Sequence, residues 1–201
     1  MRGDETDGDR GQTLPLFIWV TGAVLFASLA FFAFAQAAVA RNGAQSAADA
    51  AALAAGQEAR EELIDGLLQA LESDEPWEDW IDGLEPVGAQ ARPAAESLAA
   101  ANDADVEEFG VGETAGLQSF SVRVSTRYTV GESVIPGTEA EHAEADAIAV
   151  VEPRCSISGE DDPEEVLAFA CEGRRYEFPL DDFTEDLLPD AAVLYSVHLV
   201  G

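Results

Sequence analysis

Lysine is absent from the sequence, and its ten basic residues, all arginine, stand against forty aspartate and glutamate residues. The formal net charge of -30 excludes nucleic acid as a partner, because proteins bind phosphate backbones by neutralising them with Lys and Arg. Cysteine and histidine occur only twice each. A zinc site would need further ligands beside the cysteines, which two histidines scarcely supply, and we expect no metal centre and no cofactor.

Catalytic signatures are missing as well. The sequence has no strained Ser-containing elbow, no phosphate-cradling glycine loop and no dinucleotide fingerprint. Pairs of carboxylates are frequent, but in so acidic a chain they do not distinguish a catalytic pair from background. We therefore expect a binding or structural protein and not an enzyme.

Charge is also missing from a long stretch near the N-terminus. No charged residue occurs from Gly11 to Ala40, and the sequence from Leu14 is apolar almost throughout. About 20 such residues cross a bilayer core of roughly 30 Å. We predict a short leader over residues 1–13 and a transmembrane helix over residues 14–40, with the lipid bilayer as the first partner.

The orientation of this span is predicted from its flanking arginines. Arg2 and Arg10 precede the span, while Arg41 follows it. Because positive residues near a span favour the cytoplasmic side, we expect a cytoplasmic N-terminus and an extracytoplasmic C-terminal domain in a single-pass protein of the cell membrane.

Two alternatives to a permanent span remain open. A buried helix of a soluble protein is one, although such helices rarely contain so many consecutive apolar residues. A cleavable secretory signal is the other, because Ala38, Val39 and Ala40 resemble a small-residue cleavage site. In that case the mature chain would be a secreted acidic protein.

An alanine-rich segment over residues 41–73 follows the span and is predicted to continue the same helix, since alanine is the strongest helix former. Arg41, Gln45 and Asp49 recur every four residues as a polar stripe. Small side chains on the other faces let helices approach closely. The helix-packing residues that we predict are Ala44, Ala47, Ala48, Ala51 and Ala55. The alternative is an isolated stalk, in which alanine only stabilises the helix.

The sequence around the span resembles a known family. The run Arg10-Gly-Gln-Thr-Leu-Pro-Leu, the single span, and Gln45-Ser-Ala-Ala-Asp-Ala-Ala-Ala-Leu-Ala-Ala directly after it are similar to the N-terminal region of the TadE/TadG-like proteins of Flp (tight adherence) pilus assembly, in their actinobacterial form. The resemblance covers roughly residues 10–60. It implies a membrane-anchored assembly component whose partners are other Tad-like membrane or pilin-like proteins, contacted through the alanine-rich helix. Unlike pilin precursors, the chain has Leu16 in place of Glu at the fifth position after Gly11.

Residues 74–201 are predicted to form a small acidic α+β domain with an antiparallel sheet, because helical patterns come first and alternating patterns later. A helix is expected over residues 91–102. Strands are expected over residues 120–130, 140–151, 166–171, 175–178 and 192–200, with a tight hairpin turn at Glu172 and Gly173.

Cys155 and Cys171 are predicted to form a disulfide, since both fall in the outer domain and disulfides persist in oxidising compartments. Their spacing does not fit a redox-active Cys-x-x-Cys pair. His198 lies in an apolar strand and is expected to be packed.

A rival hypothesis is a tethered ligand-binding module. Trp77 and Trp80 lie one helical turn apart and could stack on sugar rings, although such residues more often pack as apolar anchors. His142, Glu144 and Asp146 would share one face of a strand and could bind calcium, or simply form a solvated acidic face.

Overall fold

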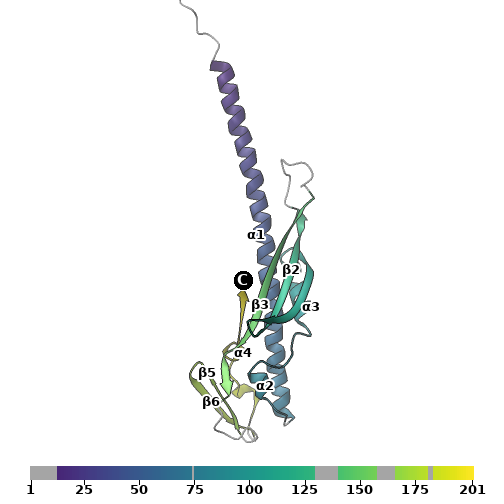
Figure 1. The fold of residues 1–201 in the computed structure, drawn as a ribbon, viewed down its shortest axis with the longest axis vertical. Helices are drawn as coiled ribbons and strands as arrows, with labels where there is room; N and C mark the ends of the chain where they lie inside the picture. The colour runs from purple at the N-terminus through teal and green to yellow at the C-terminus, as the bar shows by residue number, and fades with distance from the viewer. Residues whose placement is uncertain (1–12, 74, 130–139, 158–165, 181–182) are drawn as a thin grey trace, which may run out of the picture.

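The computed structural model describes residues 13–73, 75–129, 140–157, 166–180 and 183–201, so that the predicted leader lies almost wholly outside the described residues. Its longest element is one helix, α1, over Thr13–Glu72 (Figure 1). The helix continues without a break from the predicted span into the alanine-rich segment. Nothing in the sequence interrupts it, because its one proline, Pro15, lies in the first turn, where no intrahelical hydrogen bond is lost.

Four strands form an antiparallel sheet in the order β1-β2-β3-β7. The strands span Ala104–Thr114 (β1), Leu117–Thr129 (β2), His142–Pro153 (β3) and Tyr195–Val200 (β7). Together with α1, this sheet confirms the predicted α+β fold, in which a long N-terminal apolar helix precedes a small antiparallel domain.

A second antiparallel sheet has the order β4-β5-β6, over Cys155–Ile157, Val166–Cys171 and Arg174–Pro179. The β5–β6 turn is formed by Glu172 and Gly173, as predicted, and both have positive φ values, of 50° and 83°. Short helices complete the fold: α2 (Glu78–Ile81), α3 (Ala91–Ala101), the 3₁₀-helix η2 (Glu185–Leu187) and α4 (Ala191–Leu194).

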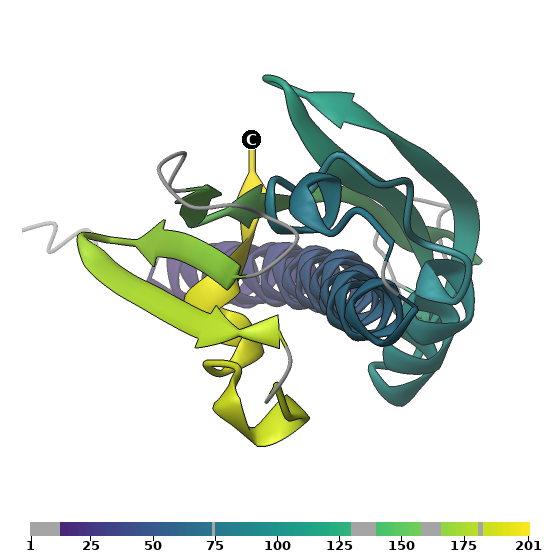
Figure 2. The same ribbon diagram turned by 90° about the horizontal axis from the view of Figure 1, so that it is seen from below.

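The core lies between the lower half of α1 and the first sheet. α1 packs against β2, β3 and β7 on one side and against α3 beside them. On β2, Phe120, Val122 and Val124 alternate toward the core and are almost fully buried. Seen along α1, β1 and β2 lie on one side of the helix and the β5–β6 hairpin on the other (Figure 2).

Several elements differ from the sequence prediction, among them the short strand β4, which was not predicted. β1 was not predicted, because its apolar residues are sparse among acidic residues and glycines. The last strand begins at Tyr195 and not near residue 192, because Asp190 caps a helical turn there: its carboxylate accepts a hydrogen bond from the Ala192 amide at 2.8 Å.

Candidate functional site

The upper part of α1 projects from the folded domain. Its most apolar 18-residue window has a mean hydropathy of 2.2 and is 0% buried, so the helix is long and apolar enough to cross a membrane. Large side chains are exposed all around it, including Phe17 at 73% and Trp19 at 79%. Burial within the chain therefore does not account for this apolar segment, which argues against the soluble-core alternative.

The junction between this segment and the domain lies at residues 40–44. Ala40 and Ala44 are buried against Ala143 of β3. Gly43 lies in the same part of α1, and a Cβ added there would collide with the hydroxyl of Tyr128. The sheet therefore first touches α1 directly below the apolar segment.

The five alanines predicted for helix packing are all fully buried: Ala44, Ala47, Ala48, Ala51 and Ala55. Their neighbours, however, belong to the same chain. Four of them join the main core with Phe120, Val122 and Ala149 of the sheet, and Ala44 joins Ala143 at the junction. The small side chains serve the close approach of the chain's own sheet, and the contact of this face with other proteins stays a prediction.

Two further glycines in α1 mark close approaches that alanine would not permit. A Cβ on Gly56 would lie 2.6 Å from Cγ1 of Val197 in β7, and one on Gly66 would collide with the ring of Trp80. A glycine inside a helix costs about 1 kcal/mol relative to alanine. This cost is offset because Val197 and Trp80 pack in the space that a side chain at Gly56 or Gly66 would fill.

The tryptophan pair packs inward. Trp77 is 4% exposed, and Trp80 lies against Gly66 while its carbonyl accepts a hydrogen bond of 2.6 Å from the hydroxyl of Tyr195. Burial raises the pKa of Tyr195 far above its ordinary value, with a smaller contribution from Asp82. Because Trp77 is buried, the two rings do not form a sugar-binding surface.

Glu62 of α1 forms hydrogen bonds with the segment that leads into α3. Its carboxylate accepts hydrogen bonds from the backbone amides of Gly88, Ala89 and Gln90, at 2.6, 3.0 and 2.7 Å. These amides lie immediately before α3, and Gln90 is its N-cap residue, at the end of the helix where backbone donors are left unpaired. Partial burial raises the pKa of Glu62, but the three hydrogen bonds together outweigh it, and the net pKa is below the ordinary value.

We expect Glu62→Gln to lower the free energy of unfolding by on the order of 1–2 kcal/mol at pH 7, because an amide cannot supply the same charged acceptor and the site is partly open to solvent. A group whose folded pKa is lowered stabilises above its unfolded pKa and loses that effect as the pH falls. The difference between the variant and the wild type should therefore shrink below about pH 4.5 in urea titrations. Glu61→Gln, at an exposed neighbouring position, is the matched control and should change little.

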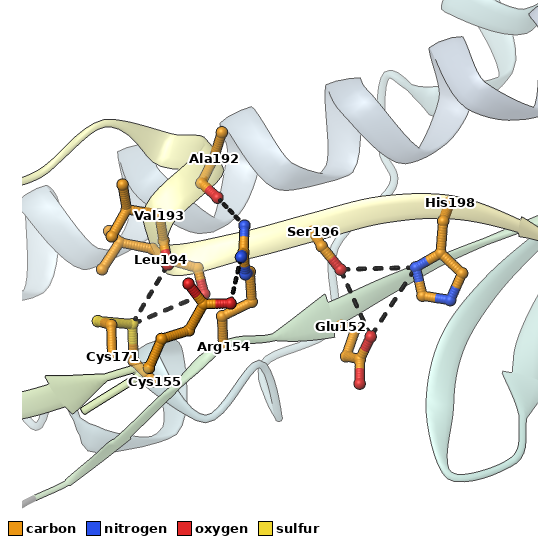
Figure 3. A network of polar contacts seen from close by, with 10 residues as sticks. Glu152, Arg154, Cys155, Cys171, Ala192, Val193, Leu194, Ser196 and His198 are labelled. Carbon is orange, nitrogen blue, oxygen red and sulfur yellow. Dashed lines mark hydrogen bonds and ion pairs between the residues drawn. A yellow bond between two sulfur atoms is a disulfide. The ribbon is translucent and has the colours of Figure 1, made fainter. Parts of the chain in front are cut away.

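The disulfide joins Cys155 of β4 to Cys171 of β5, as predicted, and the two residues face each other across the sheet. Arg154 lies next to Cys155 in the sequence, and its guanidinium forms an ion pair with Glu172. It also donates a hydrogen bond of 2.9 Å to the Ala192 carbonyl (Figure 3). An open hollow of about 490 Å³ adjoins this group. Because Arg154 is already paired, the hollow presents no free cation.

His198 was expected to be packed, but its side chain is 44% exposed beside Ser196 and Glu152 (Figure 3). The three residues do not form a catalytic triad. A triad needs serine at one imidazole nitrogen and the carboxylate at the other, whereas here Ser196 and Glu152 both face Nδ1, at 3.5 and 3.9 Å.

His142, Glu144 and Asp146 lie on one exposed face of β3, as the spacing predicted, and two of them have protein partners. Asp146 forms an ion pair with Arg123 at 2.6 Å, and Nδ1 of His142 lies 2.5 Å from the Thr126 carbonyl oxygen. Within the described ranges, no group of three or more His, Cys, Asp or Glu side chains could hold a metal ion.

Comparison with known proteins gives one match. No curated protein and no solved structure is significantly similar to the chain. The model of the putative Flp pilus-assembly TadE/G-like family matches residues 11–58, about a quarter of the chain. The match covers the exposed apolar part of α1, the junction and the first buried alanines. The resemblance predicted from the sequence is thus confirmed for this part of the chain: residues 11–58 are similar to the TadE/G-like Flp pilus-assembly family.

Proposed function

We propose that the chain is a membrane-anchored structural component of a Tad-like (Flp) pilus or a related secretion apparatus, without enzymatic activity. The observation that carries this proposal is the coincidence of two features in one helix. The segment that matches the TadE/G-like family model is also the segment in which an exposed apolar helix passes directly into a folded domain.

The domain is proposed to lie outside the cytoplasm. A disulfide supports this orientation, because disulfides persist in oxidising compartments and are rare in the cytosol. Arg2 and Arg10 before the span favour a cytoplasmic N-terminus. The high negative charge would then face the cell exterior, where it keeps the domain soluble.

Contacts with partner helices are proposed to involve the exposed upper part of α1, since the alanine face below it is occupied by the sheet. Gly22 and Ala23 leave a hollow of about 520 Å³ between the larger side chains of Ile18, Trp19 and Phe26. Small residues between large ones let two helices pack closely in lipid. Other Tad-like membrane or pilin-like proteins are the proposed partners.

A deletion strain of the host tests this function. We expect loss of assembled surface filaments, or of the corresponding secretion, and recovery with the full-length chain. The paired change Leu25→Arg and Leu29→Arg should abolish recovery, because two central arginines make membrane insertion less favourable by about 6 kcal/mol. Leu25→Ile with Leu29→Ile is the matched control and should restore assembly. Normal filaments in the deletion strain would refute the proposal.

A further inference from the structure

We propose that the chain has a second membrane contact: the upper end of the β2–β3 pair, centred on Tyr128, rests on the zwitterionic phospholipid headgroups of the bilayer that holds α1. This inference rests on the membrane anchor of the proposed function. It assigns a lipid-facing surface to the folded domain itself.

The direction of β3 relative to α1 places this end nearest the membrane. Ala143 packs against Ala40 and Ala44, whereas Ala149 lies 3.6 Å from the Cβ position of Gly56. Twelve helical residues rise about 18 Å. Six strand residues rise about 20 Å. The two elements therefore run side by side in the same direction, and the β2–β3 end points along α1 toward the apolar segment, as Figure 1 shows.

The length of the apolar segment brings that end to the level of the headgroups. Residues 14–40 of α1 extend for about 40 Å, which is more than the roughly 30 Å of hydrocarbon that they cross. Tilt of the helix shortens the projection of this segment on the membrane normal. Gly43, one turn beyond Ala40, then lies within or just above the headgroup layer, and Tyr128 lies against Gly43.

The side chains at this end suit an interface. Tyr128 is 39% exposed and combines an apolar ring with a hydroxyl, the combination that is enriched where lipid meets water. Arg41 is exposed on the adjacent turn and can reach a lipid phosphate. No acidic residue occurs on α1 before Asp49. Glu141, directly before β3, is exposed at this end, and its negative charge suits a zwitterionic headgroup better than an anionic one.

The β2–β3 end is also ordered by its own contacts. Thr126 is 2% exposed, and its hydroxyl donates to the Tyr128 carbonyl at 2.7 Å while accepting from the Ala143 amide at 3.1 Å. The strand register shifts between Ser125 and Thr129, which bends the end of the pair. Tyr128 is thus held in place against α1. With a span and this second contact, the domain would be fixed in height and in rotation about the membrane normal.

Depth-dependent fluorescence quenching tests the contact. The full-length chain, carrying Trp19→Phe and Tyr128→Trp, is placed in phosphatidylcholine vesicles that contain a lipid spin-labelled either at the headgroup or deep in the acyl chain. We expect the added emission to be quenched severalfold more by the headgroup label than by the deep label. Thr129→Trp provides a second position if Tyr128→Trp disturbs the fold.

Val111→Trp in the same background is the matched control. Val111 is 53% exposed and pairs with Phe120, which itself pairs with Ala149, at the level of Gly56. Its emission should not be quenched by either label. The parent chain reports on the anchor through Trp19, which should be quenched.

The outcomes separate the two proposals. Quenching of Trp19 without quenching at position 128 or 129 would overturn the lipid contact and leave the anchor intact. Absence of quenching at all three positions would overturn the anchor and the lipid contact together.

Discussion

Replacing Ala48 and Ala51 with leucine is expected to unfold the outer domain while leaving the membrane segment inserted. Both alanines are fully buried in the main core, where α1 meets the sheet. Each leucine adds three carbon atoms at a contact that has no room for them, which costs about 1–3 kcal/mol. The residues are neighbours, so the two costs need not be additive. Together they amount to about 2–6 kcal/mol, which reaches the lower end of the stability of a small domain, about 5–15 kcal/mol.

The measurement is urea unfolding of detergent-solubilised protein, followed by tryptophan emission, together with membrane fractionation. Ser46→Leu is the matched control, because Ser46 is exposed on the same stretch of helix and a leucine there meets no core residue. A double variant with unchanged stability but lost partner crosslinking would show that the alanine face contacts another protein after all.

The sequence predicted the elements that rest on strong local signals. The uncharged segment before Arg41 and the alanine-rich run after it allow only a long helix. Along β2, apolar residues alternate with polar ones from Phe120 onward, and this period of two specifies a strand with one buried face. The apolar face of β2 packs in the core with α1, which is why this alternation predicted the strand correctly.

Other features depend on contacts that no local pattern encodes. β1 is held by its antiparallel pairing with β2, by the contacts of Ala104, Val106 and Phe109 with the core, and by contacts between charged side chains. The cross-strand ion pairs are Glu108 with Arg123 at 2.8 Å and Asp105 with Arg127 at 2.6 Å. In a chain with forty acidic residues, these two carboxylates carry no distinguishing signal. Opposite charges on two segments joined by Ala115 and Gly116 were the available hint.

The sequence also did not reveal what packs against the alanine face of α1, which is formed by Ala44, Ala47, Ala48, Ala51 and Ala55. Small residues on a helix indicate a close neighbour, but they do not say whether the neighbour belongs to the same chain. The glycines were more informative. Gly43, Gly56 and Gly66 each weaken the helix, and each admits a side chain of the chain's own domain: Tyr128, Val197 and Trp80. These three of the four glycines in α1 were a signal in the sequence, not used in the prediction, that other elements pack on the helix.

Replacing Cys155 and Cys171 together with serine is expected to lower the free energy of unfolding by about 2–5 kcal/mol. The disulfide closes a loop with a sequence separation of 16 residues. Without it, β4 is joined to β5 only by a pairing of three residues, with Cys155 itself the first of them. We expect the second sheet to open first, since stability is not uniform across a structure, while α1 and the four-stranded sheet remain paired.

Hydrogen exchange of the intact protein distinguishes this local opening from global unfolding. Amides of β5 and β6 should exchange faster in the double variant, with β2 and β3 nearly unchanged. Ser156→Ala, at an exposed position of β4, is the matched control. Chemical reduction of the wild type should reproduce the effect of the double variant, and equal exchange before and after reduction would contradict it.

The same bond reports on the side of the membrane that the domain occupies. Protein extracted from membranes should resist alkylation until it is reduced, because its thiols are oxidised outside the cytoplasm. The variant with Leu25→Arg and Leu29→Arg, retained in the cytoplasm, should be alkylated at both cysteines without reduction. Free thiols in the membrane-bound wild type would place the domain in the cytoplasm and reverse the proposed orientation, because nothing else in the fold requires the bond to form on one side.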